Sequence, residues 1–406
     1  MRGKFSNQAT NDLKNLSVIY LDNNATTKVH PEVFQAMEPY LRDEFGNPST
    51  GYDLGKRSNE AINKAREQVS SFLNANEEEI VFTSCGTESD NAAIYSALNA
   101  NTEKRHIVTT SVEHSAVILF AKSMMPNIEI TELGVNSDGV IDLNELENAI
   151  RKDTALVTIM WANNETGICQ PIHEAAKIVK EKNTLFHTDA VNAAGKINID
   201  TNKSPIDFLS ISGHKFHAPK GIGALFVRSG SPFSPFLIGG GQENGKRAGT
   251  EAVAQIVGLG KAAELAQQRI SSDGTEKLAS LRDRLEKNIF EKIEGVHHNG
   301  CQKRRLPNTS HLSFENVDAG DLLILTNEKG LCIASGSACS TGKREPSRIM
   351  KAMGYDDERA MSSVRLSVSS MNTEKEIDEA SEIIVSCVKK IRSLRPKDGG
   401  PVIFAS

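Results

Sequence analysis

Apolar runs rich in strand-forming residues alternate with helical patterns through most of the chain before residue 250. The runs predict strands at Ile80–Thr83, His106–Thr110, Ala155–Trp161, Thr184–Thr188, Phe208–Ser212 and Ala224–Val227. The stretches between them predict helices at Ser89–Ala100, Ser115–Met124, Leu143–Arg151 and Ile172–Lys182. Strands that alternate with helices form mostly parallel sheets with helices on both faces. The pattern therefore predicts an α/β fold.

The pattern changes after about residue 250. Two long helical patterns come first, at Ala252–Arg269 and Glu276–Ile293. Short strand-like runs and a closing helix follow, at Ser310–Phe314, Ile333–Ser335, Val364–Leu366 and Glu374–Ile391. This mixture predicts a smaller α+β domain.

We expect two domains, because the chain has 406 residues and single hydrophobic cores rarely grow past roughly 250–300 residues. The large domain is expected to cover residues 28–262. The small domain is expected to combine residues 18–27 with residues 263–394. Residues 1–17 form a polar N-terminal extension in this interpretation, and residues 395–406 form a loose tail.

Composition narrows the class of protein. The net charge is -5 and 24% of residues are charged, so we expect no nucleic-acid partner and no membrane partner. No apolar run reaches the ~20 residues of a membrane helix, and the N-terminus lacks the apolar core of a secretory signal. We therefore expect a cytoplasmic protein. Its six scattered cysteines predict neither a disulfide framework nor a zinc site.

A lysine follows the predicted strand that ends at Ser212. The segment Ser212–Lys215 is followed by glycines at positions 221 and 223. Ligands of parallel sheets usually bind beyond the carboxyl ends of the strands. A lysine buried there has a lowered pKa and forms a Schiff base with an aldehyde cofactor. A surface lysine in a loop is the alternative interpretation.

Two further strand ends carry polar residues. Asp189 closes one strand, where a fixed carboxylate keeps a pyridine nitrogen protonated. Gly86 and Thr87 follow another strand and open a helix, where backbone N–H groups and a hydroxyl suit a phosphate. Taken alone, Asp189 and Thr87 are equally well interpreted as helix caps. Together with Lys215, this order of phosphate loop, carboxylate and lysine is typical of a pyridoxal 5'-phosphate enzyme with the aminotransferase-like fold.

Five motifs resemble those of cysteine desulfurases. They are Tyr20–Thr27, Trp161–Gly167, Ser212–Lys215, Lys246–Thr250 and Ser335–Cys339. Within the NifS/IscS class, the segments Phe82–Asp90 and His217–Gly221 are most similar to the NifS type. The resemblance covers residues 18–395. It implies the fold of pyridoxal-phosphate-dependent transferases, with a mostly parallel sheet in the large domain.

The resemblance implies a cofactor site. Lys215 would hold the cofactor covalently, and Asp189 would pair with its pyridine nitrogen. His114 would stack on the ring and assist proton transfers. The implied phosphate contacts come from Gly86, Thr87, Ser212, His214 and, from the second subunit of a homodimer, Thr250.

Substrate contacts are implied as well. Asn164 would contact the cofactor or the substrate, and Arg365 would bind the carboxylate of L-cysteine through a bidentate fork. One position departs from the family, because Asn192 stands where its members usually have a glutamine that contacts the phenolic oxygen of the cofactor. Since asparagine is one methylene shorter, we expect this hydrogen bond to be lost, bridged by water or restored by a backbone shift.

Cys339 has the surroundings of a reactive thiol. Its neighbours in Ala334–Lys343 are small or polar, and such a loop suits a thiolate that enters a site and leaves again. The resemblance implies that Cys339 takes the sulfur of L-cysteine as a persulfide while L-alanine is released. The sulfur would then pass to an acceptor, such as an iron–sulfur scaffold protein. No metal site is expected beyond a transient iron–sulfur cluster on Cys339.

Two other functions stay open at this point. One is a different pyridoxal-phosphate enzyme of the same fold, such as a selenocysteine lyase or an aminotransferase, because fold does not determine reaction type. An aminotransferase would not need Cys339. The other is a catalytically silent binding module, which would lack turnover. The pathway served is open too, with nitrogenase cluster supply, general cluster assembly, thiolation and selenium delivery as the choices.

Overall fold

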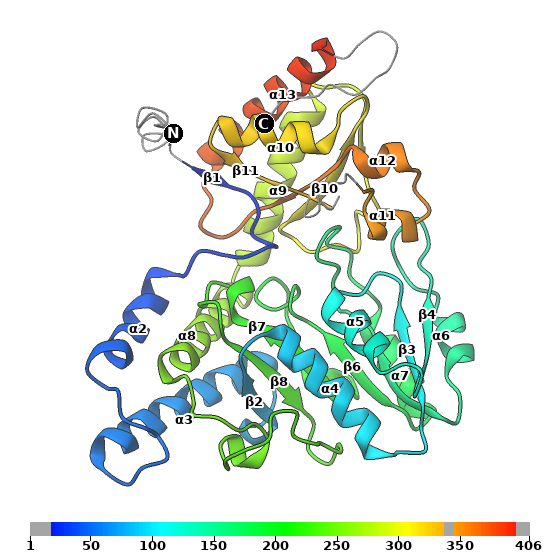
Figure 1. Cartoon of the computed structure of the whole chain (residues 1–406). Coiled ribbons are helices and arrows are strands. Elements are labelled where there is room, and N and C mark those ends of the chain that lie inside the picture. Colours follow the sequence, from blue (N-terminus) through cyan, green and yellow to red (C-terminus); the bar gives the residue numbers. More distant parts are fainter. Residues whose placement is uncertain (1–17, 337–344, 395–406) are drawn as a thin grey trace, which may run out of the picture.

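The computed structural model describes residues 18–336 and 345–394 (Figure 1). Its largest sheet has seven strands in the order β2-β8-β7-β6-β5-β3-β4. They are β2 Ile80–Thr83, β3 His106–Thr110, β4 Glu129–Leu133, β5 Thr154–Thr158, β6 Leu185–Asp189, β7 Phe208–Ser212 and β8 Gly223–Val227. Neighbouring strands run parallel except β8, which is antiparallel to β2 and β7. The predicted mostly parallel sheet is confirmed.

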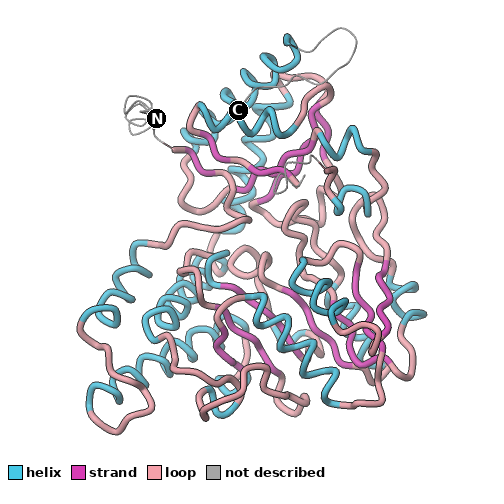
Figure 2. Tube along the Cα trace, viewed as in Figure 1, coloured by secondary structure: helices cyan, strands magenta, loops and turns pink. Residues whose placement is uncertain are grey.

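Helices cover both faces of this sheet (Figure 2). They are α2 Pro31–Arg42, α3 Asp53–Leu73, α4 Gly86–Ala100, α5 Ser115–Ser123, α6 Leu143–Ala149, α7 Ile172–Glu181 and α8 Val253–Ile270. Successive residues of a strand point to opposite faces. Phe82 and Val108 accordingly pack with residues of α3, α7 and α8, whereas Val81 and Ile107 pack with α4 and α5. Because both faces are covered, the strands are apolar almost throughout.

A second sheet is antiparallel and has the order β12-β13-β10-β9. Its strands and the elements around it are α9 Gly274–Phe290, β9 Val296–His298, β10 Thr309–Phe314, α10 Ala319–Glu328, β12 Ala334–Ser335, α11 Arg348–Ala352, α12 Asp357–Met361, β13 Ser363–Ser367 and α13 Glu374–Leu394. The N-terminal strand β1 (Ile19–Tyr20) pairs with β11 (Leu331–Cys332). Ile19 and Leu21 therefore belong to the core of this C-terminal part.

The two sheets have separate hydrophobic cores. We propose that these cores mark the two domains expected from the sequence, residues 28–262 and residues 18–27 with 263–394. Leu306 packs in the core of the larger sheet although it lies in the second range. A small cluster that includes Val112, Met160 and Ile349 connects the two parts. Residues of both parts, among them Lys215 and Asn308, line one cavity.

Some element boundaries differ from the prediction. The pattern does not predict β4, because this edge strand is partly exposed and has no continuous apolar run. It does not predict α3 either, because that helix is largely polar. α4 begins at Gly86 instead of Ser89, which places Gly86 and Thr87 in its first turn. β5 ends at Thr158, and the apolar run continues to Trp161 because Ile159–Trp161 is buried.

Candidate active site

Lys215 lies in a short 3-10 turn, Gly213–Lys215, that directly follows β7. Its Nζ donates hydrogen bonds to the carbonyl oxygens of Asn24 at 2.5 Å and Ala25 at 3.2 Å. Burial, followed by the nearby cation Arg365, lowers the pKa of Lys215 to about 8. A sizeable fraction of this amine is therefore neutral near neutral pH, as a nucleophile or base requires.

Asp189 and His114 lie near this amine. Asp189 is the last residue of β6, and its Oδ1 accepts a hydrogen bond from the Val191 N–H at 2.8 Å. Burial raises the pKa of Asp189, although the charges of His114 and Lys215 oppose the rise. His114 caps α5, where its Nδ1 accepts from the Ala116 N–H at 3.2 Å. Its Nε2 therefore carries the proton of the neutral ring.

The predicted phosphate contacts gather at the start of α4. A Cβ atom on Gly86 would lie 2.7 Å from Val191 Cγ2 and 3.4 Å from Ser212 Cβ, so only glycine fits between the ends of β6 and β7. The Cys85 side chain makes no capping hydrogen bond at this helix start, which leaves N–H groups of the first turn for an anion. Thr87 is exposed on the same turn. These donors suit a phosphate.

His214 is neutral in this structure. Burial and then the neighbouring Lys215 lower the pKa of His214 to about 4, and its Nδ1 lies 3.2 Å from Thr26 Oγ1. A neutral imidazole serves as a hydrogen-bond donor to phosphate through one nitrogen.

Asn192 is buried close to Asp189, and its Oδ1 has no hydrogen-bond partner within residues 18–336 and 345–394. The backbone carbonyl of Asn192 accepts from Lys196 Nζ at 2.8 Å. Buried polar atoms almost always have partners, so an unpaired one three residues after Asp189 fits a bound polar group. The residues present thus fit the cofactor predicted from the sequence.

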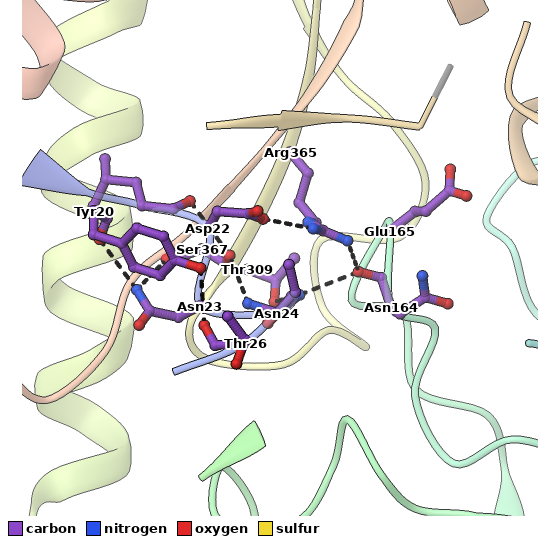
Figure 3. A network of polar contacts seen from close by, with 12 residues as sticks. Tyr20, Asp22, Asn23, Asn24, Thr26, Asn164, Glu165, Thr309, Arg365 and Ser367 are labelled. Atoms are coloured by element: carbon purple, nitrogen blue, oxygen red, sulfur yellow. Dashed lines mark hydrogen bonds and ion pairs between the residues drawn. The ribbon is translucent and has the colours of Figure 1, made fainter. Parts of the chain in front are cut away.

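Arg365 lies on β13 and joins the two parts of the chain (Figure 3). Its NH1 donates to the Asn164 carbonyl oxygen at 2.8 Å, and its NH2 donates to Asp22 Oδ1 at 2.6 Å. Its Nε is buried and has no partner among the described residues. The guanidinium is therefore held on two sides and still has a donor to offer to a carboxylate.

Asp22 was not among the residues predicted for the site. It belongs to the motif Tyr20–Thr27, and an acidic residue directly after a buried apolar strand was the available signal. Its partner Arg365 lies 343 residues away, so the pairing itself is invisible in the sequence.

One predicted residue, Thr250, is not brought to the site by this chain, and another, Cys339, cannot be placed. Thr250 is exposed, between the last 3-10 turn and α8, and its predicted role needs a second subunit. Cys339 lies outside the described residues. The nearest described residues on either side of it are Gly336 and Glu345.

A family model, Aminotransferase class-V, matches residues 19–380. The cysteine desulfurase of Nostoc sp. (strain PCC 7120) is 52% identical over 382 residues, which cover 94% of this chain and 95% of that protein. The chain belongs to the cysteine desulfurases of this family. The cysteine desulfurase NifS of Azotobacter vinelandii is 44% identical over 388 residues, covering 95% of this chain and 96% of that protein.

A solved NifS-like protein has the same fold, with a TM-score of 0.86 and 37% identity over 92% of this chain and all of that one. The predicted fold, the predicted dependence on pyridoxal 5'-phosphate and the predicted class of enzyme are therefore confirmed. In residues 18–336 and 345–394, the structure has no helix of the length and apolar character needed to cross a membrane.

Proposed function

We propose that this desulfurase converts L-cysteine to L-alanine with Lys215 as cofactor lysine and base, Arg365 as carboxylate site and Cys339 as sulfur acceptor. The observation that carries the proposal is the place of Lys215 directly after β7, where burial and then the charge of Arg365 lower the pKa of its amine to about 8.

The proposed cofactor contacts follow the strand ends. Asp189 would hold the pyridine nitrogen and Lys215 the aldehyde carbon. The first turn of α4, with Gly86 and Thr87, would hold the phosphate together with further donors, Ser212, His214 and the partner's Thr250. Asn192 would contact the phenolic oxygen with its unpaired side chain. When bound there, pyridoxal phosphate supplies an electron sink that stabilises the charge left when a proton is removed from Cα.

The chain's own groups carry out the rest of the chemistry. Arg365 binds the carboxylate of L-cysteine with the donors that Asp22 and Asn164 leave free, and Asn164 adds an amide contact. The neutral Lys215 amine removes the Cα proton and holds it. His114, with its proton on Nε2, is placed to exchange protons with the substrate as it enters and with the product as it leaves.

Cys339 completes the reaction. Its thiolate attacks the sulfur of the substrate, so that a sulfur–sulfur bond forms as the bond between Cβ and sulfur breaks. The electron pair of the broken bond stays with the carbon fragment, which takes up protons and leaves as L-alanine. A persulfide remains on Cys339 and passes its outer sulfur to an acceptor protein.

The proposed partners follow from this chemistry. A homodimer would bring Thr250 of one subunit to the phosphate site of the other. The acceptor is proposed to be an iron–sulfur scaffold protein, with nitrogenase cluster supply as one destination of the sulfur. We propose the cytoplasm as the compartment, because reducing surroundings keep the Cys339 thiol and its persulfide free of disulfides.

An anaerobic assay with L-cysteine tests the function. Alanine and sulfide are measured together in wild type, Lys215→Ala and Cys339→Ala, with Cys85→Ala as a matched control for loss of a thiol. We expect wild type and Cys85→Ala to form both products and the other two variants to lose them. Alanine and sulfide at the wild-type rate from Cys339→Ala would contradict the proposed sulfur acceptor. Slow formation of alanine from pyruvate would favour an aminotransferase instead.

A further inference from the structure

The chain segment that contains Cys339 has both its ends against one side chain, that of Glu165. On the N-terminal side, a Cβ atom on Gly336 would lie 2.1 Å from Glu165 Oε2. On the C-terminal side, Ser347 Oγ donates a hydrogen bond of 2.6 Å to the same oxygen. Gly336 and Ser347 also lie close together, since that Cβ would be 3.0 Å from Ser347 Cβ. One carboxylate oxygen therefore packs against the first end and accepts a hydrogen bond from the second.

Each of these ends is connected to the active site. Gly336 follows β12, in which Ala334 pairs with Arg365 of β13. Ser347 caps α11 by accepting from the Met350 N–H at 3.3 Å. The next residue, Arg348, donates to the Ser111 carbonyl oxygen and, at 2.5 Å, to that of Glu113, which precedes His114. The N-terminal end therefore lies next to the strand of Arg365, and the C-terminal end lies next to the residue that precedes His114.

Glu165 is itself fixed by a turn that does not depend on its side chain. Asn163 Oδ1 accepts from the Glu165 N–H at 2.9 Å and from the Thr166 N–H at 3.0 Å. Asn163 Nδ2 donates to the Val112 carbonyl oxygen at 3.0 Å. The neighbouring Asn164 carbonyl holds Arg365. Figure 3 shows Glu165 beside Asn164, with its side chain pointing away from the pair of Arg365 and Asp22.

We propose that Glu165 is a positioning residue that fixes the two ends of the Cys339 segment relative to the Arg365 carboxylate site. The proposal rests on the function proposed above. Holding Gly336 and Ser347 against one side chain fixes their separation and their place relative to Arg365. Asn163 keeps the Asn164 carbonyl that binds Arg365 in place independently. Loss of the Glu165 side chain should therefore slow sulfur transfer and leave substrate binding intact.

The test separates these two steps. Cysteine binding is followed by the absorbance change on mixing holoenzyme with L-cysteine, and sulfur transfer is followed by mass spectrometry of the persulfide on Cys339. For Glu165→Ala we expect the rate of persulfide formation to fall about ten- to a hundredfold, the range that a misplacement near 1 Å produces. The concentration of cysteine at half-saturation should stay within about twofold. Glu165→Gln keeps an acceptor for Ser347 and should restore most of the rate.

Gly336→Ala gives an independent measurement from the other end. Its new Cβ meets Glu165 Oε2 at 2.1 Å, so this variant should also slow persulfide formation. Both substitutions disturb the same contact. The double variant, Gly336→Ala with Glu165→Ala, should therefore form the persulfide no more slowly than the slower of the two single variants. If the substitutions acted independently, their rate reductions would multiply. If a thermal melt shows that Glu165→Ala is poorly folded, Gly336→Ala and Glu165→Gln still test the proposal.

Glu328→Ala is the matched control, because Glu328 is an exposed glutamate on α10, and it should behave as wild type. The proposal is overturned if Glu165→Ala forms the persulfide within about twofold of the wild-type rate, or if cysteine binding weakens as much as sulfur transfer slows. Multiplicative effects of Gly336→Ala and Glu165→Ala would overturn it too. Failure of the proposed function looks different, since wild type itself would then form neither alanine nor a persulfide.

Discussion

The lowered pKa of Lys215 predicts how fast the protein without cofactor takes up pyridoxal phosphate at different pH values. Only a neutral amine attacks an aldehyde. With a pKa of about 8 instead of 10.5, the neutral fraction of Lys215 at pH 8 is about one half, against roughly 0.3% for an ordinary lysine. The rate of uptake should therefore rise with pH, level off just above pH 8 and exceed that of an ordinary lysine by about 150-fold at pH 8.

The variant Arg365→Gln tests the cause. Burial is the main reason for the low pKa of Lys215 and the charge of Arg365 is the next. Removing that charge also leaves Asp22 without its partner at 2.6 Å, and an unpaired carboxylate near Lys215 favours the protonated amine. Both effects act in one direction. The midpoint for uptake should move upward from about 8 and stay below 10.5, because the burial of Lys215 is unchanged.

The assay is stopped-flow absorbance on the protein freed of cofactor, mixed with pyridoxal phosphate between pH 6 and 10. Arg284→Gln is the matched control, because Arg284 is an exposed arginine on α9 that pairs with Asp378. It should leave the midpoint unchanged. A midpoint near 10.5 in wild type would refute the assigned environment of Lys215. A midpoint that moves downward in Arg365→Gln would refute the electrostatic reasoning.

Two further predictions concern stability. Burial raises the pKa of Glu113 to about 8 from 4.5. As pH rises from 4.5 to 8, the unfolded chain therefore loses this proton while the folded chain keeps it, and the free energy of unfolding of the wild type should fall. Glu113→Gln has no proton to lose, so its melting temperature relative to that of the wild type should increase as pH rises from 5 to 8. Melting temperatures of the two proteins that change in parallel with pH would contradict this. Arg305→Met should lower the free energy of unfolding in urea by about 3–5 kcal/mol at pH 7. The reason is that the buried Glu286 loses the guanidinium that binds it at 2.5 Å and keeps only the weaker contact with His298 at 3.7 Å. Burial raises the pKa of Glu286, but the hydrogen bond from Arg305 and its charge outweigh burial, so the pKa is lowered. The stability lost in Arg305→Met should therefore become smaller in acid, where Glu286 is protonated. An equal loss of stability at pH 4 would contradict the ion-pair explanation.

Most of the fold was predictable because its signals are local. Each strand of the large sheet except β4 is marked by an apolar run, and every predicted element matches an observed one to within three residues at each end. β4 was not predicted because this exposed edge strand buries too few residues for a clear pattern. α3 was not predicted because most of its residues are polar, although one face of the helix is buried. The same local reasoning identified Asp189 and Lys215, since a residue at the end of a predicted parallel strand must lie at one edge of the sheet.

The sequence by itself thus determined the order of strands and helices, the family and the residues that follow the strand ends. Only the tertiary structure decided which distant groups meet. Asp22 pairs with Arg365 across 343 residues, and Glu165 lies against Gly336 while it binds Ser347. The pKa of Lys215 is likewise a tertiary property, because it depends on burial and on a cation from another sheet. Hydrophobic periodicity can be seen in the sequence itself. Charge pairing and desolvation arise only after packing has brought separate segments together.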